Sequence, residues 1–388
     1  MNFDLTEEQQ MLQDSAKRYV DKTYTFEART KLVRENGGFS RATWQTFAEM
    51  GWLAAPIPEA YSGLGFSAVE TSLIAEQIGR GLVLEPFTMC GVFPATVVLH
   101  CAAEAQKEEL SAGIACGAML VAVAHGEGDA RGRVAHVTTS AKRQADGSYW
   151  LNGRKTLVVG APVADRILVV ARTAGEMADE QGISLFLLDP KVVGVKLEAC
   201  KLLDGTPAGD LVLKDARVPA SALLGSEGAA YAGLQRAVDE AIVSLCAETV
   251  GAMEDVLALC SEYLKTRKQF GVAIGSFQAL QHRMADMAIE TSQARATLHR
   301  ALAAFADPAI SDLSVVISGC KAQAMRSAKF VTAQGIQLHG GYGITEEYRV
   351  GHHYRRLVFT DAAFGNMEYH LNRYARAIQA EARSMAAA

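Results

Sequence analysis

The chain has 388 residues, of which 49% are hydrophobic and 21% charged, and its formal net charge is -5 at pH 7. This length allows two or three domains that each bury a core. The slightly acidic balance argues against nucleic acid as a partner, because binding to a phosphate backbone requires a concentrated positive face. The polar N-terminus and the absence of a long uncharged stretch predict a cytoplasmic protein that does not enter a membrane.

Seven cysteines are scattered along the chain, and most have apolar neighbours. They are Cys90, Cys101, Cys116, Cys200, Cys246, Cys260 and Cys320. An odd number without a repeated spacing is typical of buried thiols in a reducing compartment. We therefore expect neither a disulfide framework nor a metal site.

Residues 1–118 are predicted to form a helical domain. Thr6 followed by Glu7, Glu8 and Gln9 is a capping-box pattern, in which the threonine hydroxyl accepts a hydrogen bond from an N–H of the first helical turn. The two glutamates then lie at the positive end of the helix. Another helix is expected from Ala68 to Gly81, after the turn-rich loop PIPEAYSGLGFS.

Residues 119–225 change to short alternating runs separated by turns, for example at 134–141, 148–151, 166–171 and 184–188. Asp146 and Gly147 stand between two of these runs and are a hairpin signal. We predict a compact antiparallel barrel or sandwich in this region.

Residues 226–388 are predicted to be helical and to form a four-helix bundle. Apolar residues recur at three- and four-residue spacing from Leu234 to Leu264, and the same period restarts at Phe277. Further helices are expected at about 310–337 and 365–382. The fold is therefore mainly α with a β middle domain.

The segment that joins the first two of these helices carries Arg267, Gln269 and Phe270, followed by Gly271 and Gly275. Glycine lets the backbone approach a ligand closely, and arginine pairs with phosphate groups. This combination fits a phosphate-bearing partner that contains a ring. A plain helix hairpin with a solvated basic corner is the alternative.

The stretch from Arg267 to Met287 resembles the signature of the flavin-dependent acyl-CoA dehydrogenases, and the resemblance extends over nearly the whole chain. It implies a helical N-terminal domain (1–118), a β middle domain (119–225) and a C-terminal four-helix bundle (226–388). It also implies FAD as cofactor, an acyl-CoA substrate, and electron-transfer flavoprotein or a similar acceptor as partner.

The resemblance implies which residues contact the ligands. In the family, the signature reaches from a neighbouring subunit to the pyrophosphate and adenine end of FAD, and a Gln-x-x-Gly-Gly-x-Gly motif closes over the same end. The residues expected to bind FAD are Arg267, Gln269, Phe270, Gln278, Gln337, Gly340, Gly341, Asn366 and Glu368. Asp239 is the expected substrate contact.

The middle domain departs from the family pattern. Family members hold the flavin ring with a Thr-Glu-Pro-x-Ala-Gly-Ser-Asp loop, which aligns here on Glu127 with glycines at the Thr, Pro and Ser positions. Leu157 and Val159 replace the Trp and Thr of a second segment. Backbone N–H groups are still available, but this face offers fewer contacts to a flavin.

Desaturation of an acyl-CoA requires a base that removes the α-proton while the flavin accepts a hydride. Where most family members place the catalytic Glu, this chain has Phe364, which cannot accept a proton. Where other members place it, this chain has Ala241. The remaining candidates are Glu248, Glu240 and Asp361, and for each a structural carboxylate is the alternative.

The C-terminal pattern from Phe364 to Arg376 resembles the small-subunit branch of the family, which includes the pimeloyl-CoA dehydrogenase small subunit. In that branch, a degenerate subunit pairs with a partner that carries the base. We therefore expect an acyl-CoA dehydrogenase component in a homo- or hetero-oligomer. Two alternatives stay open: a self-sufficient dehydrogenase with Glu248 or Glu240 as base, and a non-catalytic CoA-binding or scaffold protein without flavin. The sequence does not predict the acyl chain.

Overall fold

The computed structural model describes residues 4–307, 310 and 312–387. The chain divides into two compact units. Unit 1 consists of Met1–Arg29, Ser72–Val83 and Ile242–Ala388, and unit 2 consists of Thr30–Thr71 and Leu84–Ala241. Each unit thus combines segments that are far apart in the sequence. The three domains expected from the sequence, with boundaries near residues 118 and 225, stay a prediction.

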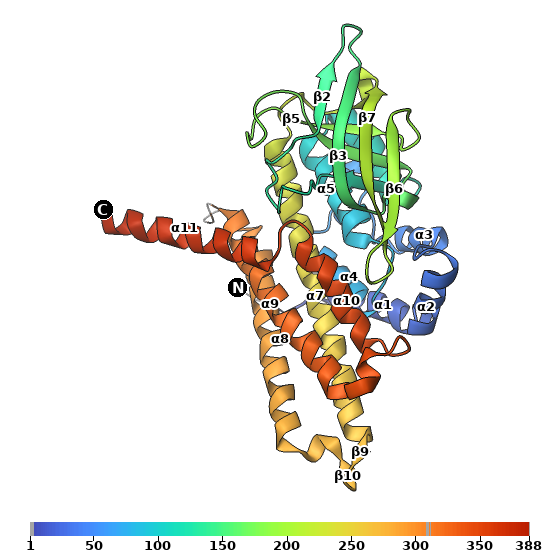
Figure 1. Cartoon of the computed structure of the whole chain (residues 1–388), viewed down its shortest axis with the longest axis vertical. Helices are drawn as coiled ribbons and strands as arrows, with labels where there is room; N and C mark the ends of the chain where they lie inside the picture. The colour runs from blue at the N-terminus through green and yellow to red at the C-terminus, as the bar shows by residue number, and fades with distance from the viewer. Residues whose placement is uncertain (1–3, 308–309, 311, 388) are drawn as a thin grey trace. The chain divides into compact units, whose positions relative to one another are not determined.

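Unit 1 is built of helices (Figure 1). They are α1 (Glu7–Thr23), most of α4 (Ala68–Arg80), most of α7 (Tyr231–Thr266), α8 (Gln278–Ala304), α9 (Leu313–His339), α10 (Val350–Ala362) and α11 (Met367–Ala387). Helix α8 packs against α9, and α9 packs in turn against α10 and α11. Between α7 and α8, the short strands β9 (Lys268–Gln269) and β10 (Val272–Ala273) form a hairpin.

The local signals in the sequence explain where these helices form. On α7, Val250 and Met253, three residues apart, and Cys260 and Leu264, four residues apart, are buried, at the spacing that the apolar stripe predicted. The capping box is confirmed, because the Thr6 hydroxyl accepts a hydrogen bond from the Gln9 N–H and the Gln9 side chain accepts one from the Thr6 N–H. Among the described residues, no helix combines the length and the apolarity that crossing a bilayer requires.

Helix α10 is an element that the sequence patterns did not predict. Its inner face is partly polar, because it buries His352 and His353. The buried carboxylate of Asp255 accepts hydrogen bonds from Arg349 at 2.6 Å and from His353 at 2.9 Å, and His352 Nε2 lies 3.1 Å from the Glu346 carbonyl, so each of these side chains has a polar partner for one of its nitrogens. Apolar periodicity does not reveal a helix whose buried face carries histidines.

Helices α4 and α7 approach each other so closely in unit 1 that their backbones touch. A Cβ at Gly79 would overlap the backbone of Glu248, and a Cβ at Gly251 would overlap the backbone of Glu76. Each of these two glycines therefore leaves room for the backbone of the opposite helix. Arg295 of α8 lies near this crossing and binds the buried Glu76 carboxylate at 3.0 Å.

Unit 2 contains an eight-stranded sheet with the order β6-β7-β3-β2-β4-β5-β8, in which β1 also pairs with β4. The strands are β1 (Val121–Ala124), β2 (Ser140–Arg143), β3 (Tyr149–Val159), β4 (Arg166–Arg172), β5 (Ile183–Leu188), β6 (Val195–Lys201), β7 (Pro207–Val218) and β8 (Leu223–Leu224). The helices of this unit include most of α2 (Phe26–Glu35), α3 (Arg41–Glu49), α5 (Phe93–Cys101), α6 (Glu104–Ala115) and the start of α7, up to Ala241.

The strand predictions hold in part. The predicted hairpin at Asp146 and Gly147 joins β2 to β3, and Gly147 has the positive φ of 82° that such a turn requires. Most strand pairs are antiparallel, as predicted, but β1 and β2 both pair with β4 in parallel. The alternation of side chains along a strand does not reveal the direction of its neighbour.

The cysteines do not all lie in the interior. Four are buried, namely Cys90, Cys246, Cys260 and Cys320. Cys116 and Cys200 are exposed, contrary to the expectation of buried thiols. Apolar neighbours in the sequence are thus a poor guide to the burial of one residue.

The α4–α7 crossing predicts that Gly251→Ala destabilises the protein. The new methyl group would overlap the Glu76 backbone, so the helices must separate, at a cost of about 1–3 kcal/mol in the free energy of unfolding. Denaturant unfolding measures this change. Gly128→Ala is the matched control, because its new methyl group meets open space. Equal stability of the two variants would contradict the role assigned to the crossing.

Candidate functional site

A groove of about 640 Å³ opens in unit 1 where α7 ends and α9 ends. Five of the residues predicted to bind a cofactor line it together, although they come from two stretches about 70 residues apart. They are Arg267, Gln269, Gln337, Gly340 and Gly341. The fold therefore brings the two sequence motifs to one place within a single chain.

The groove suits a phosphate group. In the described part of the chain, the exposed Arg267 guanidinium has no hydrogen bond or ion pair to another residue, so its donors are available. Gly340 ends α9 with a φ of 60°, and a Cβ at either Gly340 or Gly341 would meet open space. The Gly340 N–H already donates to the Gln337 carbonyl, but the space beside both glycines is open, so a phosphate oxygen can come close to the backbone at Gly341.

Three of the residues that line the groove carry rings, namely Tyr263, His339 and Tyr342, and Tyr348 packs against two of them. The ring centroid of His339 lies 4.5 Å from that of Tyr263 and 4.8 Å from that of Tyr348, and the centroids of the mutually tilted rings of Tyr348 and Tyr342 are 4.4 Å apart. The His339 Nδ1–H donates to the Gly335 carbonyl at 2.7 Å, so His339 Nε2 accepts from the Tyr348 hydroxyl at 3.1 Å. Burial lowers the pKa of His339, which keeps the ring neutral at pH 7.

The sequence patterns did not single out Tyr263 or Tyr348 for this site. A single tyrosine carries no periodic signal. Tyr263 lies four residues before Arg267, which directly follows α7 and whose N–H donates to the Tyr263 carbonyl at 2.8 Å, and this spacing is the signal that would have found Tyr263.

The other residues predicted to bind the cofactor do not line the groove. Phe270 is 92% exposed at the tip of the β9–β10 hairpin, and Gln278 begins α8. Asn366 and Glu368 lie at the start of α11, beyond the whole of α10, which is about 20 Å long. Their role in binding stays a prediction.

Phe364, at the position expected for the base, is 5% exposed and has a φ of 59°, a backbone conformation that non-glycine residues rarely adopt. The buried His370 fixes this turn, because its Nε2–H donates to the Phe364 carbonyl at 3.1 Å while its Nδ1 accepts from the Ser318 hydroxyl. Burial and the nearby Lys321 lower the pKa of His370 to about 3, so the ring is neutral. No proton acceptor is thus offered by the Phe364 side chain.

The candidate carboxylates on α7 are both engaged. In unit 2, Glu240 accepts a hydrogen bond from Arg236 at 3.0 Å and lies 2.9 Å from His100 Nε2. In unit 1, Glu248 lies 3.8 Å from the guanidinium of Arg356 and lines a cavity of about 20 Å³, which has room for about one water molecule. These contacts are typical of structural carboxylates.

The other two carboxylates that the sequence singled out, Asp361 and Asp239, also have partners nearby in the chain. The Asp361 carboxylate accepts a hydrogen bond from the Met367 N–H at 2.9 Å, at the start of α11. The buried Asp239 accepts one from Gln235 at 3.2 Å, one turn earlier on α7. Contact of Asp239 with substrate stays a prediction.

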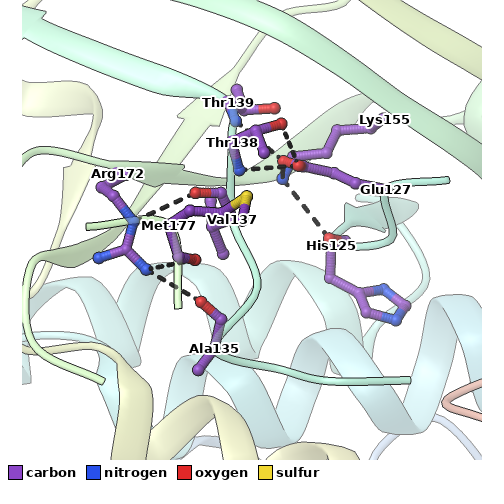
Figure 2. A network of polar contacts seen from close by, with 9 residues as sticks. All are labelled: His125, Glu127, Ala135, Val137, Thr138, Thr139, Lys155, Arg172 and Met177. Carbon is purple, nitrogen blue, oxygen red and sulfur yellow. Dashed lines mark hydrogen bonds and ion pairs between the residues drawn. The ribbon is translucent and has the colours of Figure 1, made fainter. Parts of the chain in front are cut away.

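In unit 2, Glu127 forms a buried ion pair with Lys155 of β3, at 2.6 Å (Figure 2). The Glu127 carboxylate also accepts hydrogen bonds from the N–H groups of Thr138 and Thr139, so it closes the loop that begins at Gly126. Burial alone would raise the pKa of Glu127, but Lys155 and Thr138 lower it to about 2. Burial lowers the pKa of Lys155 to about 8.

Arg172 fixes the far end of the same loop (Figure 2). Its guanidinium is almost completely buried and donates only to backbone carbonyls in the described structure. These belong to Ala135, Val137, Ala174, Met177, Asp179 and Gln181. The loop from Gly126 to Thr139 is therefore held at both ends by buried cations.

The ion pair predicts that Lys155→Met destabilises the protein by about 3–5 kcal/mol, because it leaves the Glu127 carboxylate buried without a counter-charge. Denaturant unfolding at pH 7 measures the loss. The double variant Lys155→Met with Glu127→Gln should recover most of it, since the uncompensated charge is then gone. A double variant that is no more stable than Lys155→Met would contradict this account.

Comparisons with known proteins identify the family of the chain. Three family models match: the acyl-CoA dehydrogenase N-terminal domain over residues 6–118, the middle domain over 122–216 and the C-terminal domain over 230–379. The probable acyl-CoA dehydrogenase YngJ of Bacillus subtilis is 30% identical, over 90% of this chain and 92% of its own. The acryloyl-CoA reductase (NADH) of Anaerotignum propionicum is 28% identical, over 95% of this chain and 94% of its own.

A solved structure agrees as well. Butyryl-CoA dehydrogenase from Megasphaera elsdenii superposes with a TM-score of 0.87 at 26% identity, covering 98% of this chain and 100% of that chain. The chain therefore belongs to the acyl-CoA dehydrogenase family, and the fold that its sequence motifs implied, with helical N- and C-terminal domains and a β middle domain, is confirmed.

Proposed function

We propose that this protein is an FAD-dependent component of an acyl-CoA dehydrogenase, an oxidoreductase that introduces a double bond between Cα and Cβ of an acyl-CoA thioester. The observation that carries the proposal is the groove of unit 1, which Arg267, Gly340 and Gly341 line together. Relatives named for butyryl-CoA and acryloyl-CoA support a CoA thioester as substrate.

The residues present fit the ADP end of FAD, which the solved structure of the relative PigA contains. Arg267 would neutralise the pyrophosphate, and the N–H group of Gly341 would donate to one of its oxygens. Tyr342, which is 48% exposed, would offer a ring face to the adenine. FAD, when bound, supplies the acceptor for the hydride that leaves Cβ.

The proposal also concerns the catalytic base, which we expect another subunit to supply. Phe364 cannot act as a base, and Glu240 and Glu248 are both tied to arginines. A general base contributes on the order of a hundred- to ten-thousand-fold in rate. We therefore place this chain in the small-subunit type, in which a partner subunit supplies the base.

The electron acceptor is a second partner. The relative CarC of Acetobacterium woodii is named as a subunit of a caffeyl-CoA reductase-Etf complex. This supports electron-transfer flavoprotein, or an acceptor like it, as the partner that reoxidises the flavin here.

FAD binding predicts an effect of Arg267→Gln. Loss of the charged donor should raise the dissociation constant of FAD about 10- to 100-fold, as expected when a hydrogen bond to a charged group is removed. Titration of the flavin-free chain with FAD, followed by flavin fluorescence, measures this. Arg326→Gln is the control, because Arg326 is an exposed arginine of unit 1 that does not line the groove. Equal weakening in both variants would contradict a pyrophosphate contact.

The missing base predicts that Glu248→Gln leaves dehydrogenation unchanged. The chain should be co-expressed with the adjacent reading frame, and the purified complex assayed with acyl-CoA and an artificial electron acceptor. Activity of the complex, little activity of the chain alone, and turnover of the Glu248→Gln complex within about twofold of wild type are expected. A loss of a hundredfold or more on Glu248→Gln would favour the self-sufficient enzyme instead. Absence of flavin in both preparations would favour the non-catalytic alternative.

A further inference from the structure

The short helix η6 (Gly340–Ile344) follows α9 and lies on one side of the groove in unit 1. It begins where the Gly340 N–H donates to the Gln337 carbonyl, three residues earlier. A bond of this span shapes a turn, but it does not determine where the turn lies relative to Arg267, which directly follows α7. Contacts to other segments must therefore place η6.

His339 supplies such contacts, because its buried ring joins several segments. Its Nδ1–H donates to the Gly335 carbonyl of α9, and its Nε2 accepts from the hydroxyl of Tyr348, four residues after η6. On the side of α7, the ring packs against Tyr263, and Cys260 Sγ lies 3.9 Å from Nδ1. The ring thus ties the segments on both sides of η6 to the last turns of α7.

Helix η6 also packs directly over His339. A Cβ at Gly343 would lie 2.6 Å from the Ile336 carbonyl oxygen and 3.1 Å from the His339 Cβ, so no side chain fits there. A Cβ at Gly341, by contrast, would meet open space. Helix η6 therefore packs one side against His339 and leaves Gly341 open to the groove.

The stability of the fold does not by itself require a histidine bonded to a tyrosine here. Replacing both members of a hydrogen-bonded pair by apolar groups of the same shape can leave stability nearly unchanged. A hydrogen bond depends on direction and apolar packing does not, so the bond between His339 and Tyr348 adds orientation. Only the neutral ring can donate from Nδ1 and accept at Nε2, and burial keeps it neutral at pH 7 by lowering the pKa of His339.

We propose that His339 is a positioning residue for the phosphate site: by binding the Tyr348 hydroxyl, it fixes η6 beside the end of α7, so that Gly341 and Arg267 contact the same diphosphate. His339 acts through Gly341 and does not itself donate to the phosphate, because its Nδ1–H is used by Gly335 and its Nε2 carries no proton. This inference rests on the proposed function, because it takes the diphosphate to be that of FAD.

The first experiment titrates the full-length, flavin-free chain with FAD and, separately, with ADP, which carries the diphosphate without the flavin ring. Tyr348→Phe keeps the ring and removes the hydroxyl, so it should raise the dissociation constants of FAD and ADP about fivefold. His339→Phe should have the same effect. Tyr354→Phe is the control and should leave both constants unchanged, because Tyr354 belongs to α10 and does not line the groove.

The second experiment separates positioning from a structural role. The double variant His339→Phe with Tyr348→Phe leaves neither member of the pair without a partner, so the flavin-free chain should unfold at a temperature close to that of wild type. FAD and ADP should still bind about fivefold more weakly, as in the single variants, because all three variants lack the same hydrogen bond. A structural role would instead lower the unfolding temperature of the double variant and leave the affinity of the folded chain unchanged.

The outcomes distinguish this inference from the proposed function. If the wild-type chain binds FAD and ADP while His339→Phe and Tyr348→Phe bind them equally well, the positioning role is wrong and the proposed function stands. A loss of affinity for FAD without a loss for ADP would also contradict the positioning role, because both ligands carry the diphosphate. If the wild-type chain binds neither ligand, both proposals are wrong.

Discussion

The buried ion pair between Lys155 and Glu127 is the interaction on which unit 2 depends. Two charges removed from water must find each other with good geometry, so the pair admits only one position of β3 against the loop that starts at Gly126. A slip of one residue along β3 would turn Lys155 to the other face of the sheet. The pair thereby fixes the register of β3, and with it a β-bulge at Leu157, two residues later.

Much of the fold was predictable because its signals are local. The Thr6 capping box, the apolar stripe of α7 and the turn at Gly147 each depend on residues within one or two turns of each other. The parallel pairing of β4 and the helix α10 were not predictable in this way. Both depend on partners far away in the sequence, as when Asp255 of α7 compensates the buried His353 of α10.

In the candidate site, too, local sequence signals were predictable and contacts between distant segments were not. Arg267 and Gly340 belong to motifs with recognisable spacing, and the fold places both on one groove. The ring contacts of Tyr263, His339 and Tyr348 arise only once α7 and the end of α9 are packed together. The pairing of Glu248 with Arg356 is also a tertiary contact, about 110 residues apart, so sequence alone could not show that this carboxylate is engaged.

Arg172 adds a consequence for the order of assembly. One guanidinium at the end of β4 binds carbonyls before β2 and carbonyls between β4 and β5, so these two connections are cross-linked without a covalent bond. Neither connection can form its hydrogen bonds to Arg172 until β4 has joined the sheet. Both connections lose these hydrogen bonds together if β4 leaves the sheet. They should therefore order and disorder as one cooperative segment, and amide hydrogen exchange should be correlated across both.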